Sequence, residues 1–175
     1  MNIFDIAKQN QEKAWQVIKN TNIIQIWEDA GAKINLVGSL RTGLLMKHRD
    51  IDFHIYSSPL NLADSFLAMA RLAENPSIKR IECANLLHTS EACIEWHAWY
   101  QNEENELWQM DMIHIREGSR YDGYFEKVAK RIAAVLTDET RRAILQLKFE
   151  TPVTEKVMGV EYYHCLLYTS DAADE

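Results

Sequence analysis

The chain has 175 residues, of which 47% are hydrophobic and 26% are charged, a balance that fits one packed domain and excludes collagen-like and low-complexity classes. Its 19 basic and 26 acidic residues give a formal net charge of −7, so we do not expect a long nucleic acid as its main partner. No apolar run approaches the roughly 18 residues of a membrane span, no secretory signal precedes the first helix, and three scattered cysteines form no disulfide framework. We expect a cytoplasmic protein without a membrane partner.

The elements follow from the spacing of apolar residues. Steps of three and four predict helices, alternation predicts strands, and Gly and Pro mark the ends. The expected order is one long or two consecutive helices over 3–30, a strand over 34–37, a loop rich in Gly and basic residues, a strand over 50–56, a helix over 60–75, strands over 78–87, 92–101 and 107–115, and helices over 124–136 and 138–149.

This order predicts an α/β (α+β) fold, with a central mixed sheet flanked by helices and a helical C-terminal part. We assign residues 1–117 to a catalytic domain that includes the N-terminal helices, and residues 118–164 to the C-terminal helical part. Residues 165–175 back-translate into the transposon-end adapter of sequencing libraries. We interpret them as a non-native tail that truncates the C-terminal part, with a polar terminal tail as the alternative, and exclude them from fold reasoning.

A Gly-Ser turn follows the first predicted strand. Gly38 and Ser39 come directly after Val37, where the small residues let backbone amides and a hydroxyl approach phosphate oxygens closely. The turn therefore predicts a phosphate cradle.

Carboxylates follow the cradle at a defined spacing. Asp50 and Asp52 lie two apart on a predicted strand and so point to the same face. Asp111 lies between two methionines on a later strand that reads as buried, where an unpaired carboxylate is costly. Like charges held together need a cation between them, and hard oxygen ligands suit Mg²⁺ or Mn²⁺. We expect these three residues to be catalytic metal ligands.

The pattern of Val37, Gly38 and Ser39, then Asp50-Ile51-Asp52-Phe53, and finally Asp111 resembles the nucleotidyltransferase superfamily. This group shares the catalytic domain of DNA polymerase beta and includes small antibiotic-modifying enzymes of bacteria. The resemblance covers roughly residues 30–116. It implies that Asp50, Asp52 and Asp111 bind the metal, that Asp111 can also activate the acceptor hydroxyl, and that Gly38 and Ser39 hold the nucleotide.

Several other residues have both a functional and a structural interpretation. Arg41, two residues beyond Ser39, is placed to neutralise a triphosphate, or else belongs to a solvated basic loop. Glu95 and His97 share one face of a strand and could serve the acceptor side or form a solvent-facing polar row. His54 shares a face with the aspartates, and we favour a structural role for it.

We therefore expect a bacterial-type, Mg²⁺- or Mn²⁺-dependent nucleotidyltransferase. It would move a nucleoside monophosphate from a nucleoside triphosphate, with ATP favoured, to a hydroxyl of a small molecule or a protein. The alternative is a catalytically silent module of the same fold that binds nucleotide or a partner protein. A pyrophosphoryl transferase would use similar aspartates, but the additional basic and tyrosine pattern is not found.

Overall fold

The computed structural model describes residues 2–152, 154, 155, 157, 159 and 161–163. The predicted adapter-derived tail, residues 165–175, lies outside this part of the chain. Among the described residues, no helix is long and apolar enough to cross a membrane.

The N-terminal helical segment consists of two helices, α1 (Ile3–Thr21) and α2 (Ile23–Asp29). Asn22 separates them in the left-handed conformation, with φ of 53°, and its backbone amide caps α1 by bonding the carbonyl of Lys19. Of the two predicted arrangements, two consecutive helices is therefore the correct one, and a single long helix is wrong. The two helices bury most of the apolar positions that the periodicity indicated, including Ile18, Ile23 and Trp27. Trp15 and Ile24, which the same spacing placed with them, are exposed instead.

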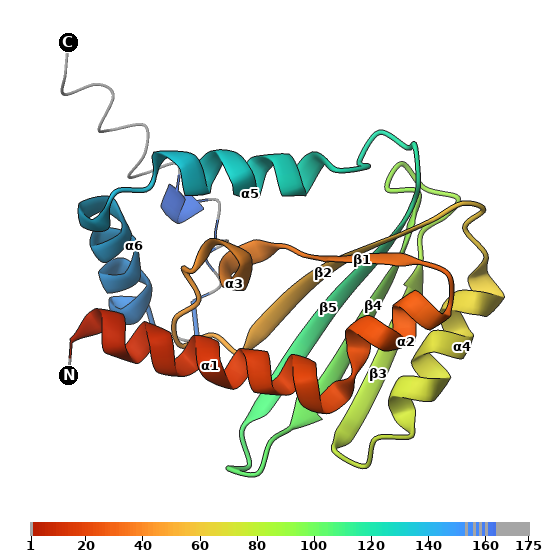
Figure 1. The fold of residues 1–175 in the computed structure, drawn as a ribbon, viewed down its shortest axis with the longest axis horizontal. Coiled ribbons are helices and arrows are strands. Elements are labelled where there is room, and N and C mark those ends of the chain that lie inside the picture. The colour runs from red at the N-terminus through yellow and green to blue at the C-terminus, as the bar shows by residue number, and fades with distance from the viewer. Residues whose placement is uncertain (1, 153, 156, 158, 160, 164–175) are drawn as a thin grey trace.

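A five-stranded mixed sheet forms the centre of the molecule (Figure 1). Its strands lie in the order β1-β2-β5-β4-β3; β2 and β5 are parallel, and the other neighbouring pairs are antiparallel. The strand bounds are Lys33–Leu36 for β1, Asp50–Ser57 for β2, Ile78–Asn85 for β3, Cys93–Gln101 for β4 and Leu107–Arg116 for β5. The predicted mixed sheet is confirmed, and each strand lies within two residues of its predicted bounds.

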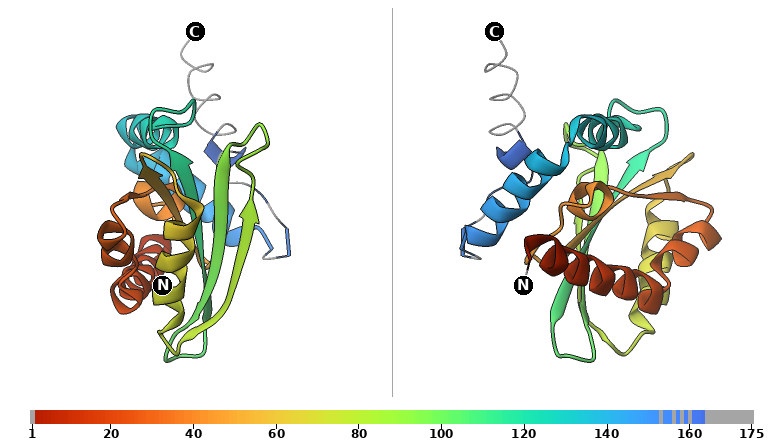
Figure 2. Two further views of the ribbon diagram at one scale, coloured as in Figure 1. Left: turned by 90° about the vertical axis from the view of Figure 1, so that its right-hand side faces the viewer. Right: turned by 60° about the vertical axis from the view of Figure 1, so that its left-hand side comes forward.

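The two faces of the sheet differ. Helices α1, α2 and α4 (Leu62–Ala73) lie together on one side of it (Figure 2), and the alternate residues that point to them are apolar and buried, as in Ile51 and Phe53 of β2 and Met110 and Met112 of β5. Because successive side chains of a strand point to opposite faces, Asp50, Asp52 and Asp111 belong to the second face.

Three helices, α3 (Gly38–Thr42), α5 (Tyr124–Val135) and α6 (Asp138–Glu150), lie around the part of the second face that β2 forms. α3 begins directly after β1, inside the segment that we predicted as a loop. α5 and α6 follow the turn after β5, where the predicted boundary between residues 117 and 118 falls. Thr137 caps α6, and its side chain accepts a hydrogen bond from the backbone amide of Thr140.

Helix α6 donates hydrogen bonds to the last residue of α3 and to the residues that follow it. The Nη1 atom of Arg141 donates to the carbonyls of Thr42 and Gly43 at 3.1 and 3.2 Å, and Nζ of Lys148 donates to the carbonyl of Leu44 at 3.1 Å. The C-terminal helices therefore help to shape the region around the predicted cradle.

Candidate active site

The predicted cradle contains a glycine at a position where any side chain would be strained and crowded. Gly38 has φ of +67°, a region that side-chain-bearing residues rarely adopt, and a Cβ atom added there would lie 1.9 Å from Oδ2 of Asp52. Only a bare Cα lets the start of α3 approach the carboxylate this closely. The cradle and the aspartates thus form one site, although eleven residues separate Gly38 from Asp50.

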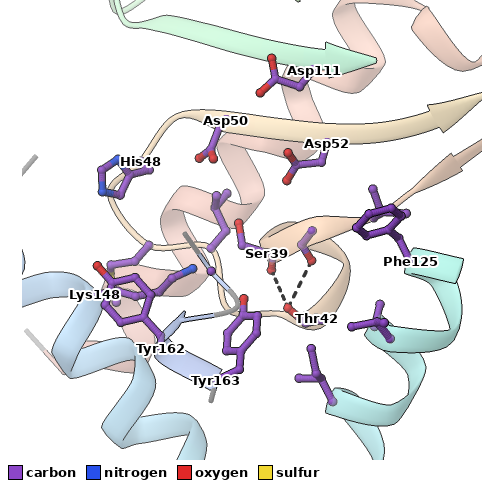
Figure 3. Close-up of a pocket in the computed structure, with 18 of the residues that line it drawn as sticks. Ser39, Thr42, His48, Asp50, Asp52, Asp111, Phe125, Lys148, Tyr162 and Tyr163 are labelled. Atoms are coloured by element: carbon purple, nitrogen blue, oxygen red, sulfur yellow. Dashed lines mark hydrogen bonds between the residues drawn. The ribbon is translucent and has the colours of Figure 1, made fainter. Parts of the chain in front are cut away.

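The strand pairing brings the three predicted carboxylates together. β2 and β5 run parallel with Asp52 directly opposite Asp111 and Asp50 opposite Gln109. Neighbouring strands are about 4.8 Å apart, and Asp50 lies two residues from Asp52 on the same face. Figure 3 shows Asp50 and Asp52 side by side above Ser39, with Asp111 beyond them on the neighbouring strand.

Burial and the neighbouring like charges strongly perturb Asp52. Burial, followed by the charges of Asp50 and Asp111, raises the pKa of Asp52 to about 7, although Lys148 and the backbone amide of Ser39 oppose the shift. In addition, Oδ1 of Asp50 is buried without a hydrogen-bond partner. The positive charge of Lys148 therefore does not offset the burial and the like charges at Asp52.

These residues fit a divalent cation. An orphaned carboxylate oxygen beside two further carboxylates offers the hard ligands that Mg²⁺ and Mn²⁺ prefer, and a cation there would relieve the repulsion. The described part of the chain contains no preformed cluster of three or more metal-ligating side chains. The fit therefore rests on the chemistry of the donors and not on a finished coordination shell.

A cavity of about 620 Å³ lies between the carboxylates and helices α3, α5 and α6, large enough for a ligand of the size of a nucleotide. Ser39, Thr42 and the aspartates form its polar end, whereas the side that α5 contributes is mainly apolar: Phe125, Val128, Ala129 and Ile132. The cavity thus offers a polar end for charged groups and an apolar wall for a ring.

Besides His48 and His54, the cavity is lined by Lys148, which was not predicted from the sequence. Its side chain lies among Tyr162, Tyr163 and the carboxylates (Figure 3), with 7% of the residue exposed. Burial lowers the pKa of Lys148, and the charges of Asp50 and Asp52 oppose this shift. A lysine three residues after Leu145, on the buried face of α6, was the available signal, because buried lysines usually have a charged partner.

The arginines and the lysine between Ser39 and Asp50 do not line this cavity. Arg41 is exposed on α3 and is not among the residues that line the cavity. Lys47 donates to the carbonyl of Phe149 at 2.6 Å, and Arg49 forms an ion pair with Glu106 at 2.7 Å. The last two therefore have structural partners, and the role of Arg41 as a nucleotide ligand stays a prediction.

The remaining candidates occupy different places on the second face. His97 of β4 lies opposite Asp111, and its Nδ1 atom is 2.5 Å from Oδ1 of that residue. Glu95 lies opposite Ile113, outside the cavity lining. His54 lines the cavity and packs edge-on against Phe125, with ring centroids 4.7 Å apart; burial lowers its pKa.

Comparison with known proteins gives a fold but no sequence family. No family model matches the chain, and no curated protein matches it. Among solved structures, it is similar to Cid1, described with an RNA terminal uridylyl transferase activity, at a TM-score of 0.60 and 11% identity over 89% of this chain and 46% of that chain.

Two further structures give the same result. A cytoplasmic RNA terminal U-transferase matches with a TM-score of 0.60 and 11% identity over 95% of this chain and 51% of that one. The GLD-2/RNP-8 complex matches with a TM-score of 0.61 and 8% identity over 92% and 57%. The chain spans about half the length of these proteins. It has the fold of the DNA polymerase beta-like nucleotidyltransferases, as the motif resemblance predicted.

Proposed function

We propose that this chain is a nucleotidyltransferase that depends on Mg²⁺ or Mn²⁺ and transfers a nucleoside monophosphate from a nucleoside triphosphate to a hydroxyl group. The observation that carries the proposal is the row of Asp50, Asp52 and Asp111 beside the Gly38 cradle. A shared fold by itself does not select an activity, because one fold hosts many functions. ATP is the first donor to test.

Each residue of the site has a defined task in this reaction. The acceptor oxygen bonds to the α-phosphorus while the bond to pyrophosphate breaks, and Asp111, whose side chain is 24% exposed, takes the hydroxyl proton. The backbone at Gly38 and Ser39 binds the triphosphate, and Lys148 offsets part of its charge. Bound divalent cations supply polarisation of the phosphate oxygens.

The acceptor that we favour is a small molecule or a protein. Glu82 and Glu95 lie on the sheet face that continues from Asp111 across β4 and β3. Arg80 on this face is already engaged, since it is paired with Glu82 and lies 4.2 Å from the ring centroid of Trp99. Such a surface suits a neutral or cationic acceptor better than a phosphodiester chain. Because Cid1 acts on RNA, an RNA oligonucleotide is the necessary comparison.

A labelling assay tests the proposal. The protein is incubated with each α-³²P-labelled nucleoside triphosphate, with Mg²⁺ or Mn²⁺, and with small hydroxyl compounds, proteins or an RNA oligonucleotide as acceptors. We expect label transfer that Asp52→Asn lowers more than about 100-fold, since even outer partners of metal ligands are worth about 10–100-fold. Asp5→Asn, an exposed aspartate on α1, is the control and should leave transfer unchanged.

Thermal shift separates the enzyme from its silent alternative. Stabilisation by ATP with Mg²⁺, and much less by ATP alone, is expected if the metal joins the carboxylates to the triphosphate. The same shift without transfer to any acceptor would favour the catalytically silent module. If the protein shows no thermal shift and no label transfer, both the enzyme and the silent module are overturned.

A further inference from the structure

Two side chains hydrogen-bond to the carboxylate of Asp111. Nδ1 of His97 lies 2.5 Å from Oδ1 of Asp111, and Nε2 of Gln109 donates to the same oxygen at 2.7 Å. Both hydrogen bonds end on Oδ1, which leaves Oδ2 of Asp111 for a ligand in the cavity that this residue lines.

The sheet itself imposes this arrangement. His97 and Asp111 are directly opposite in the antiparallel pair of β4 and β5, and Gln109 lies two residues before Asp111 on the same face of β5. Because all three side chains project from paired strands, they share a rigid support. A site placed on paired strands is held more precisely than one placed on loops.

The proton position follows from the chemistry of the pair. An ionised carboxylate only accepts hydrogen bonds, so Nδ1 of His97 carries the hydrogen and donates it. This bond occupies Nδ1, and His97 is not among the residues that line the cavity, whereas Asp111 is. His97 therefore acts on Asp111 directly and on a ligand only through Asp111.

We propose that His97 is a positioning residue that, with Gln109, fixes the orientation of Asp111 so that Oδ2 is presented to the metal. This role rests on the proposed function and differs from the acceptor-side role that the sequence suggested for His97. Partners of this kind hold a ligating group in one orientation before the metal arrives, and their loss typically weakens metal binding about 10–100-fold.

The test measures Mn²⁺ affinity by electron paramagnetic resonance in the presence of a non-hydrolysable ATP analogue. His97→Leu removes the donor and should weaken Mn²⁺ binding about 10–100-fold. His97→Asn keeps an N–H donor near the position of Nδ1 and should stay within about threefold of wild type. His88→Leu, an exposed histidine in the loop after β3, is the matched control and should bind Mn²⁺ as wild type does.

Gln109→Leu provides a second, independent variant, for which we expect weaker Mn²⁺ binding in the same direction. It decides the question should His97→Leu fail to fold, as judged by circular dichroism. The positioning role is overturned if a folded His97→Leu variant binds Mn²⁺ as tightly as wild type does. If His97→Leu does not fold, wild-type affinity in Gln109→Leu overturns it. In either case the proposed function still stands. Absence of Mn²⁺ binding by the wild-type protein would overturn both.

Discussion

Two clusters of polar residues lie on opposite faces of the sheet, and each includes a residue of strand β5. The cluster around His114 is fully hydrogen-bonded, whereas the cluster of aspartates is not. On the helix-covered face, Nε2 of His114 lies 2.7 Å from Oγ of Ser57. Nδ1 of His114 lies 3.1 Å from Oγ of Ser65, and the same oxygen accepts a 2.8 Å hydrogen bond from Nε1 of Trp96. On the other face, Asp50, with an unpartnered oxygen, lies near further carboxylates.

The difference distinguishes a structural polar group from a functional one. Burial lowers the pKa of His114 to about 4, so this histidine is neutral and fully bonded, and it ties β5 to β2 and α4. The pKa of Asp52 is instead raised by burial and by two like charges. Protein interiors satisfy the polar groups that they need for stability, whereas unrelieved charge in a cavity indicates a ligand.

The largest effect is expected at the cradle. Gly38→Ala places a Cβ atom against Asp52 and strains the backbone, so we expect loss of nucleotide binding and of most transfer activity, together with a stability loss of about 1–3 kcal/mol. Gly31→Ala is the matched control, since Gly31 also has positive φ, +77°, but nothing lies within 4 Å of its added Cβ. Isothermal titration with ATP and Mg²⁺, and chemical denaturation, measure the two effects. Equal losses of nucleotide binding in both variants would contradict a cradle that depends on close approach.

Lys148→Met is expected to weaken nucleotide binding about 10-fold or more, because a charged hydrogen-bond donor to phosphate contributes about 1.5–3 kcal/mol. Nζ of Lys148 lies 5.7 and 5.8 Å from the ring centroids of Tyr162 and Tyr163, and methionine removes this charge while keeping an unbranched apolar side chain. Lys127→Met, at an exposed position of α5, is the control. Unchanged affinity of Lys148→Met for the metal–nucleotide pair in the same titration would exclude a role for this lysine in binding.

A substitution in the hydrogen-bonded cluster around His114 should change the stability of the protein and not its activity. Ser65→Ala leaves Nε1 of Trp96 and Nδ1 of His114 without their shared partner, which costs about 1–3 kcal/mol. Transfer activity per folded molecule should not change. Denaturant unfolding and the labelling assay measure the two quantities, with Ser90→Ala in the exposed loop after β3 as the control. A specific loss of activity would show that the two faces are coupled.

The smallest effect is a pH dependence of opposite sign at the two clusters. The pKa of Asp52 is about 7 in the folded protein against an ordinary 3.8, so its burial destabilises the metal-free protein as pH rises from about 4 to about 7. The pKa of His114 is about 4 against 6.5, so this histidine instead destabilises the fold as pH falls through that range.

We therefore expect Asp52→Asn to raise Tm by a few degrees at pH 8 relative to wild type, and by less at pH 4. Thermal unfolding in the presence of EDTA measures the difference at each pH. A Tm difference that does not change with pH would contradict the assignment of the repulsion to Asp52.

Local patterns predicted the elements of the fold well, since alternation and helical spacing depend on which side of each segment is buried. The motif of Gly38, Asp50 and Asp52 was likewise readable, because its spacing lies within one strand–helix–strand unit. Lys148 was not readable as a site residue, since nothing within α6 indicates which distant charges its side chain meets. Arg41 was suggested by proximity in sequence, but a helical turn after Ser39 directs it to the surface.

The amino-acid sequence by itself determined the strands, the helices and the three carboxylates, because side-chain chemistry and periodicity are local properties. Only the tertiary structure decided that β5 pairs parallel with β2, which places Asp111 beside Asp52 although two strands and a helix intervene in the chain. It alone placed Lys148 in the cavity and joined His97 to Asp111. These contacts depend on the strand order and register of the whole sheet, which result from the packing of all its residues together.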